Sequence, residues 1–328
     1  MEYINLGRTA LRVSRLCLGT MNFGPVTSEI DGRAIMSRAL DLGINFFDTA
    51  DVYGRKRGEG VTENIIGGWL VQDTARRERV VLATKVGGRM GDGPNDHGLS
   101  ARHIVSACEA SLRRLRTDHI DLYQMHHVDR SAPWEEIWQA MDLLVDQGKV
   151  RYVGSSNFAG WHIATCQAAA DRRHGLGLVS EQSHYNLMTR HAELEVLPAA
   201  QAHGMAVFPW SPLAGGALSG ALAKVDSGAA GRSASESIRA TTDAHHDQLR
   251  SWESFCRELG HRPAEVAIAW LLAQPAVTAP IIGPRTIEQL EASMSSFTVD
   301  LDEAALATLD EIFPPIGNGG PAPEAWAW

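Results

Sequence analysis

Eight short apolar runs, separated by longer segments with helical periodicity, constrain the possible folds of this chain most strongly. Short apolar runs bounded by turns are typical of buried parallel strands, and parallel strands need long crossover connections. Eight strand-then-helix units without a break in composition predict an α/β fold, a (β/α)8 TIM barrel that forms a single domain over residues 1–328. The runs lie at residues 16–18, 44–47, 80–83, 120–123, 151–153, 178–179, 205–208 and 280–282.

Two further segments complete this predicted architecture. Residues 2–5 and 11–14, on either side of Gly7, resemble an N-terminal hairpin that could close the floor of the barrel. Residues 214–246, after the seventh strand, are rich in Ala, Gly and Ser and predict a long loop of the kind that often forms a functional lid. A doubly wound sheet is the alternative fold, but no G-x-G-x-x-G follows the first strand.

Charge and cysteine usage narrow the possible partners. The net charge is −9, whereas binding to nucleic acid requires clustered Lys and Arg, so we expect no nucleic-acid partner. No apolar stretch reaches the length of a membrane span, and the N-terminus has no signal-peptide pattern. Four widely spaced cysteines without metal-ligand spacing indicate buried free thiols, so we expect a cytoplasmic protein without a metal site. They are Cys17, Cys108, Cys166 and Cys256.

Titratable side chains stand at the carboxyl ends of successive predicted strands. Asp48 ends the second strand and Tyr53 lies in the loop beyond it. Lys85 ends the third strand and His126 ends the fourth, although His127 competes for the same role. Strand alternation implies that these two histidines cannot both point inward. Because barrel active sites form at the carboxyl ends of the strands, these groups predict one catalytic cluster.

This combination of groups suits the reduction of a carbonyl, which needs hydride at carbon and a proton at oxygen. Tyrosine is a weak acid with an ordinary pKa of about 10, and a nearby ammonium lowers that pKa by stabilising the phenolate. Asp48 can keep Lys85 charged and oriented, and His126 can donate a hydrogen bond to the carbonyl oxygen. Tyr53 would then be the proton donor.

With these motifs in place, the sequence resembles the aldo-keto reductase superfamily over residues 1–315, in its bacterial and plant-like branch related to potassium-channel β subunits. The matching stretches include FFDTADVYG at residues 46–54, IDLYQMH at 120–126, and residues 16–20, 60–67, 83–85, 153–158, 181–186, 210–213 and 282–290. The resemblance implies a catalytic tetrad of Asp48, Tyr53, Lys85 and His126.

The same resemblance implies an NADP(H) site across the barrel mouth. Trp210 would stack on the nicotinamide, and the Arg285 guanidinium would match a 2′-phosphate. Residues 214–246 would be the cofactor lid. The full implied cofactor set is Thr20, Met21, Asp48, Ser156, Asn157, Gln182, Trp210, Ser211, Pro212, Leu213, Gly215, Gly216, Gly283, Arg285, Gln289 and Ser293.

The implied substrate is a small-molecule carbonyl compound bound by variable loops. The expected lining residues are Phe23, Tyr53, Arg89, Met90, His126 and His127. The C-terminal tail, residues 313–328, carries two tryptophans that would dock on the barrel mouth or on a second copy in a homo-oligomer.

Three other functions compete with a reductase of aldehydes and ketones. One is a cofactor-sensing regulatory subunit with slow turnover, and another is a reductase of nucleotide-linked keto sugars. The third is an unrelated barrel isomerase, since a fold by itself does not determine function. The complete tetrad favours catalysis, because a binding module has no need of all four groups.

Overall fold

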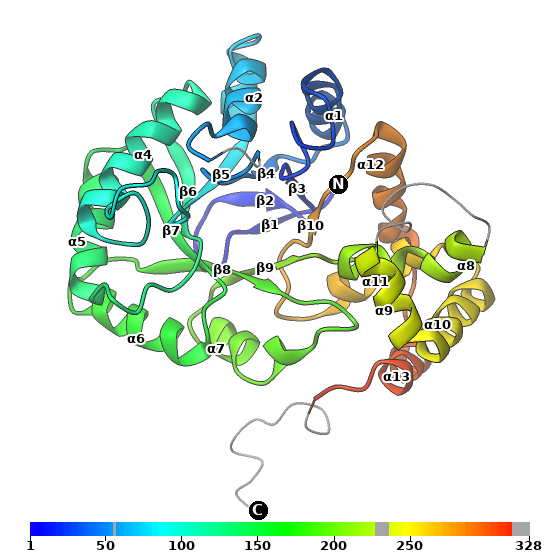
Figure 1. Cartoon of the computed structure of the whole chain (residues 1–328). Coiled ribbons are helices and arrows are strands. Elements are labelled where there is room, and N and C mark those ends of the chain that lie inside the picture. Colours follow the sequence, from blue (N-terminus) through cyan, green and yellow to red (C-terminus); the bar gives the residue numbers. More distant parts are fainter. Residues whose placement is uncertain (55–56, 227–235, 317–328) are drawn as a thin grey trace, which may run out of the picture.

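The computed structural model describes residues 1–54, 57–226 and 236–316 of the chain. Eight parallel strands run in the order β10-β3-β4-β5-β6-β7-β8-β9 (Figure 1). A parallel bridge between Val207 and Val277 brings β9 to the segment that leads into β10 and closes the barrel. The strands are β3 (Cys17–Gly19), β4 (Phe46–Asp48), β5 (Val81–Val86), β6 (Ile120–Met125), β7 (Val150–Ser156), β8 (Leu178–His184), β9 (Ala206–Trp210) and β10 (Ile281–Ile282).

Helices surround this barrel, which confirms the predicted (β/α)8 architecture (Figure 1). The helix from Ala101 shows why these segments fold as they do, since Ser100 caps its first turn by accepting from the His103 N–H, and Ile104 and Cys108 face the core. The α-helices are α1 (Glu29–Asp41), α2 (Val61–Leu70), α3 (Ala75–Arg79), α4 (Ala101–Leu115), α5 (Trp134–Asp146), α6 (Gly160–Asp171), α7 (Val196–Ala202), α8 (Ala221–Asp226), α9 (Glu236–Ala244), α10 (His246–Leu259), α11 (Pro263–Ala273), α12 (Ile287–Met294) and α13 (Glu303–Ile312).

The buried side chains form two cores. The larger lies between the strands and the outer helices, and the smaller fills the barrel interior. An antiparallel hairpin of β1 (Tyr3–Asn5) and β2 (Arg12–Ser14) contributes Leu6 and Val13 to the inner core, both fully buried. The predicted hairpin therefore exists and closes the floor, which leaves the opposite end as the open mouth.

The segment predicted as a long loop after the seventh strand is largely helical. Residues 214–226 form a 3-10 helix, η2 (Ala214–Ser219), followed by α8, and α9 covers Glu236–Ala244. This corrects the predicted loop, and the reason is its alanine content, since alanine has the highest helix propensity. Residues 227–235 lie outside the described part of the chain, as do residues 317–328 with both tail tryptophans.

The cysteines are free and buried, as expected. Within the described ranges, no helix has the length and apolar character needed to cross a bilayer.

The floor contact allows a test of how much the inner core contributes to stability. We expect Leu6→Ala to lower the free energy of unfolding by about 2–5 kcal/mol, because it removes a fully buried side chain and leaves a cavity. Urea unfolding followed by circular dichroism measures this loss. Ile30→Ala is the control, since Ile30 is 81% exposed, and it should change stability by less than about 0.5 kcal/mol. Equal losses in the two variants would contradict a sealed floor.

Candidate active site

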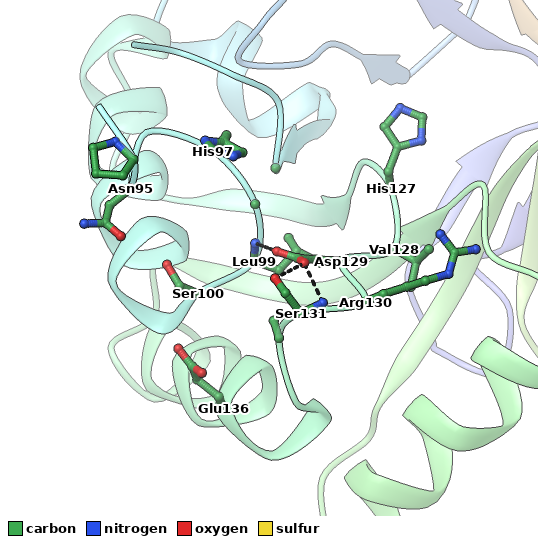
Figure 2. Close-up of a pocket in the computed structure, with 14 residues that line it drawn as sticks. Asn95, His97, Leu99, Ser100, His127, Val128, Asp129, Arg130, Ser131 and Glu136 are labelled. Atoms are coloured by element: carbon green, nitrogen blue, oxygen red, sulfur yellow. Dashed lines mark hydrogen bonds between the residues drawn. The ribbon is translucent and has the colours of Figure 1, made fainter. Parts of the chain in front are cut away.

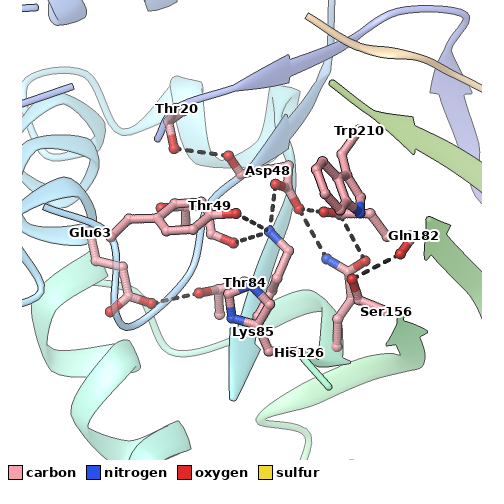
Figure 3. Close-up of polar contacts among 12 residues, drawn as sticks. Thr20, Asp48, Thr49, Glu63, Thr84, Lys85, His126, Ser156, Gln182 and Trp210 are labelled. Carbon is pink, nitrogen blue, oxygen red and sulfur yellow. Dashed lines mark hydrogen bonds and ion pairs between the residues drawn. The ribbon is translucent and has the colours of Figure 1, made fainter. Parts of the chain in front are cut away.

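An ion pair between two adjacent strands forms the centre of the open mouth. Lys85 of β5 is fully buried, and its Nζ lies 2.6 Å from Oδ2 of Asp48 at the end of β4. The same Nζ donates to the Thr49 carbonyl at 2.8 Å and to the Tyr53 Oη at 3.1 Å (Figure 3). The lysine therefore directs one proton to each of three oxygens, and three sequence-predicted catalytic residues meet at one point.

The cluster holds its charges in a defined state. Burial lowers the pKa of Lys85, but the Asp48 carboxylate and Tyr53 outweigh this effect, so the Lys85 pKa is raised and the ammonium persists. Burial raises the pKa of Tyr53 and Asp48 adds to this, while Lys85 opposes both. We expected Lys85 to lower this pKa. Its contribution has that sign, but burial prevails because the phenol is almost completely enclosed, so Tyr53 is a protonated phenol at neutral pH.

His126 lies beside this cluster as a neutral ring. Burial, with help from Lys85 and His127, lowers the pKa of His126 to about 2. Its ring meets the Tyr53 ring edge to face at 5.9 Å, and its Nδ1 is buried without a hydrogen-bond partner among the described residues. The Nε2 edge is therefore the one that can meet a ligand.

Strand alternation would place the side chains of His126 and His127 on opposite faces of the sheet. The structure instead places them on the same side. The strand β6 ends at Met125, so both histidines lie beyond the pleat. Their rings stack nearly parallel, with centroids 5.0 Å apart and planes within 3°, and His127 lies on the exposed side. His127 therefore supports the outer face of His126.

Two glutamines orient the other oxygen of Asp48. Its Oδ1 accepts hydrogen bonds from Gln124 at 3.0 Å and from Gln182 at 2.9 Å. Gln182 also donates to the Gln124 side chain at 3.2 Å, and Thr20 Oγ1 donates to the Asp48 carbonyl at 2.8 Å. Gln124 was not among the predicted site residues. Its signal was its position on the same strand face as His126.

Asn157 ties three strand ends together with one side-chain amide. Its Nδ2 donates to the His126 carbonyl at 3.1 Å and to Ser156 Oγ at 3.0 Å, and its Oδ1 accepts from Trp210 Nε1 at 3.0 Å. The Asn157 backbone has φ 59°, a left-handed conformation that asparagine tolerates better than most residues. Ser156 in turn donates to the Gln182 carbonyl at 2.8 Å.

Trp210 is held on a second side by His184, which the sequence analysis did not select. The two rings stack 4.2 Å apart with planes within 9°. Asn186 Nδ2 lies 3.4 Å from His184 Nε2 and donates to the Ser211 carbonyl at 3.0 Å. Both residues belong to the 181–186 stretch that carried the resemblance, which was the available signal.

The loop after Trp210 has an unusual backbone. Ser211 and Ala214 have φ of 57° and 47°, and Gly215 and Gly216 follow with 68° and 120°. Left-handed conformations at non-glycine residues cost free energy and are found disproportionately at binding sites. Pro212 is buried and Leu213 is partly buried within the same turn.

Four residues of the implied cofactor set lie together around the start of α12, namely Gly283, Arg285, Gln289 and Ser293. Gln289 Oε1 accepts from the Arg285 N–H at 2.9 Å, and Ser293 Oγ donates to the Gln289 carbonyl at 2.9 Å. Asn22 donates to the Gly283 carbonyl at 3.0 Å, which links this region to the loop after β3. A helix N-terminus preceded by arginine favours anions.

The expected substrate-lining residues do not all lie at the mouth. Phe23 is fully buried and its ring lies against Gly32 of α1, so the structure places it in the outer core. Arg89 is exposed and Met90 is partly buried, and Met21 of the implied cofactor set is 54% exposed. His127 also lines a cavity of about 450 Å³ between the loops that follow β5 and β6 (Figure 2). Other residues lining this cavity include Gly87, Asn95, His97, Asp129, Arg130 and Glu136.

The fold and this centre together define a TIM-barrel protein with a buried tyrosine, lysine and carboxylate at the carboxyl ends of its strands. A sequence profile described as "Aldo/keto reductase family" matches residues 15–313. The chain belongs to the aldo/keto reductase family.

Curated relatives agree with this assignment. The chain is 53% identical, over the full length of both proteins, to "Uncharacterized oxidoreductase YrpG" of Bacillus subtilis. It is 36% identical to "Probable voltage-gated potassium channel subunit beta" of Oryza sativa, covering 91% of this chain and 92% of that protein. It is 34% identical to "Versiconal hemiacetal acetate reductase" of Aspergillus parasiticus, covering 96% and 98%. The family supports an oxidoreductase, and its members generally use NAD(P)H.

The state of His126 can be tested directly. A histidine in an unfolded peptide titrates near pH 6.5, whereas we expect the His126 ring to stay neutral from pH 8 to pH 5, because its pKa is about 2. Heteronuclear NMR of the imidazole nitrogens measures this, with the signals assigned by their absence in His126→Gln. A titration midpoint above pH 5 would contradict a desolvated, neutral His126.

Proposed function

We propose that this protein is an NADP(H)-dependent reductase of aldehydes and ketones, with Tyr53 as the proton donor. The observation that carries the proposal is the triple contact of Lys85 Nζ with Asp48, Thr49 and Tyr53 at a buried barrel mouth. The contact between the Lys85 ammonium and the Tyr53 hydroxyl supports this role, because the ammonium can stabilise the phenolate that remains when Tyr53 gives up its proton.

The chain's own residues support a definite division of roles. The Nε2–H of a neutral His126 holds the carbonyl oxygen of the substrate by a hydrogen bond, and Tyr53 delivers its proton to that oxygen. Lys85 stabilises the resulting phenolate until solvent returns a proton. When bound, a reduced nicotinamide supplies the hydride that the carbonyl carbon receives.

Several features fit a nicotinamide dinucleotide. Gln182 uses its Nε2 to donate to Asp48 and Gln124, which leaves its Oε1 for a carboxamide N–H. The Trp210 indole is fixed in orientation by Asn157 and His184 and offers a flat surface of the kind that stacks on a ring. The left-handed turn from Ser211 to Gly216 is built from small residues, which permits close approach of the backbone to a pyrophosphate.

The preference for NADP(H) rests on Arg285. A planar guanidinium can make two parallel hydrogen bonds to a phosphate, and Arg285 stands immediately before the N-cap of α12. A 2′-phosphate at this position would meet both the guanidinium and the positive end of the helix dipole. We further propose a cytoplasmic location, supported by four free, buried cysteines.

A regulatory subunit is the second candidate, favoured by the similarity to a protein named as a probable potassium channel β subunit. The number of turnovers distinguishes the two functions. A reductase consumes many equivalents of NADPH per protein with a suitable aldehyde, whereas a sensor oxidises the one NADPH that it binds and then releases product slowly.

The acid role of Tyr53 predicts a selective loss. We expect Tyr53→Phe to lower kcat by about 10²-fold or more, because it removes the positioned proton donor, while the Kd for NADPH stays within about threefold. Steady-state kinetics with a panel of aldehydes and fluorescence titration measure the two quantities. Tyr152→Phe is a matched control outside the cluster. A Tyr53→Phe variant that keeps turnover within about tenfold would refute the assigned role.

The cofactor preference predicts a difference between two titrations. We expect Arg285→Ala to weaken NADPH binding by about tenfold or more and NADH binding by less than about threefold, because only NADPH carries the 2′-phosphate. Quenching of tryptophan fluorescence by each cofactor measures both constants. Equal weakening would mean that Arg285 contacts a part of the dinucleotide common to both.

A further inference from the structure

Asp51 is a buried carboxyl group that the tetrad mechanism does not use. It is 1% exposed and lies two residues before Tyr53 in the turn after β4. Neither of its side-chain oxygens makes a hydrogen bond of normal geometry with a described residue. An ionised carboxylate is strongly unfavourable in a buried position that lacks such hydrogen bonds, whereas a protonated carboxylic acid carries no charge there.

The turn that carries Asp51 is the turn that places Tyr53. The Asp51 N–H donates to the Lys85 carbonyl at 3.3 Å, and the Tyr53 N–H donates to the Ala50 carbonyl at 3.2 Å. The Tyr53 carbonyl accepts from the Thr62 N–H at 3.4 Å, which fastens the far end of the turn to α2. These backbone hydrogen bonds hold Asp51 and Tyr53 in one turn, so the Asp51 carboxyl group lies within the segment that positions the proton donor.

The other buried charges of this region already balance without Asp51. Asp48 pairs with Lys85 at 2.6 Å, and Glu63 of α2 pairs with Arg114 of α4 at 2.7 Å. Glu63 also accepts from Thr84 at 2.6 Å (Figure 3). These two pairs leave no described cation over, so an ionised Asp51 would be a third, uncompensated buried anion. A buried anion without a compensating cation is strongly unfavourable, which favours a protonated Asp51.

We propose that Asp51 is a positioning residue for Tyr53: it remains a neutral carboxylic acid under the Tyr53 turn, and its ionisation at alkaline pH switches the proton donor off. The inference rests on the proposed reductase function for its catalytic consequence, but the protonation state of Asp51 is a property of the fold. The ionisable groups that face it are Tyr53 on its own turn, Lys85 of β5, Glu63 of α2, Arg114 of α4 and Tyr123 of β6.

The electrostatics of the site agree with this geometry. Burial raises the pKa of Asp51 to about 8, and the Glu63 carboxylate adds to the rise, while Arg114, the Val52 N–H and Lys85 oppose it. Once ionised, Asp51 would raise the pKa of Tyr53 further and make it a weaker acid. The new charge would also draw water into the turn. Both effects reduce proton delivery to the substrate.

The matched variant is Asp51→Asn, which keeps the shape and the neutral state. We expect its kcat at pH 7 to lie within about threefold of wild type. Between pH 7 and pH 9 the wild-type kcat should fall about tenfold, as a group with a pKa of about 8 requires, while the Asp51→Asn kcat falls less than about twofold. The control is Asp118→Asn, since Asp118 is 92% exposed, and its profile should follow wild type.

Stability provides a readout that does not depend on activity. The folded-state pKa of Asp51 is about 8 and the unfolded value is about 3.9, so its contribution is fully present below pH 3.9 and is lost as pH rises through 8. We therefore expect the urea midpoint of Asp51→Asn, relative to wild type, to increase steadily from pH 5 to pH 8. A role in packing alone would give a constant difference.

Infrared spectroscopy of the wild-type protein gives a third readout. At pH 7 we expect a protonated carboxylic acid C=O band that Asp51→Asn lacks and that disappears above pH 8. An unchanged alkaline limb in Asp51→Asn, or a tenfold loss of kcat at pH 7, would overturn the proposal. If the protein reduces no carbonyl compound, the proposed function fails, and the infrared band and the urea midpoints still decide the state of Asp51. Absence of the band would then overturn the inference.

Discussion

The buried ion pair between Lys85 and Asp48 is the interaction on which the barrel mouth depends. Its charges lie where water cannot stabilise them, so each charged group needs hydrogen bonds from other polar groups of the protein. Lys85 donates further hydrogen bonds to Thr49 and Tyr53, and Asp48 accepts hydrogen bonds from Gln124 and Gln182. The requirement to satisfy one pair thus orders side chains from β4, β5, β6 and β8 around a single point.

Around this charged pair the remaining acid–base groups are kept neutral. Burial holds the Tyr53 phenol protonated and the His126 ring uncharged. A neutral imidazole can donate to a carbonyl oxygen without releasing a competing proton, and a protonated phenol is ready to transfer one. The site therefore keeps one persistent cation, Lys85, in contact with a neutral phenol.

The barrel and the positions of the tetrad could be predicted from sequence because both follow from short-range patterns. Alternating apolar runs determine strand and helix order, and the carboxyl ends of parallel strands necessarily converge. No sequence pattern indicates the direction of a side chain beyond the end of a strand, and for this reason the stacking of His127 on His126 was not predicted. Phe23 lies in the core because burial of an apolar ring is more favourable in free energy than its exposure at a solvated barrel mouth. The partnership of His184 with Trp210 joins residues 26 positions apart and depends on the register of β8 and β9.

Asn157 has a consequence for how such a protein can diversify. Its amide links the ends of β6 and β9 to its own position after β7, so the spacing of these strand ends does not depend on the loops outside them. The loop after β6, which carries His127 and part of the lining of its cavity, begins beyond that link, as does the loop after β9. Insertions and substitutions in those loops can therefore accumulate over evolutionary time and reshape the surface around the mouth, while the ends of β6, β7 and β9 keep their relative positions.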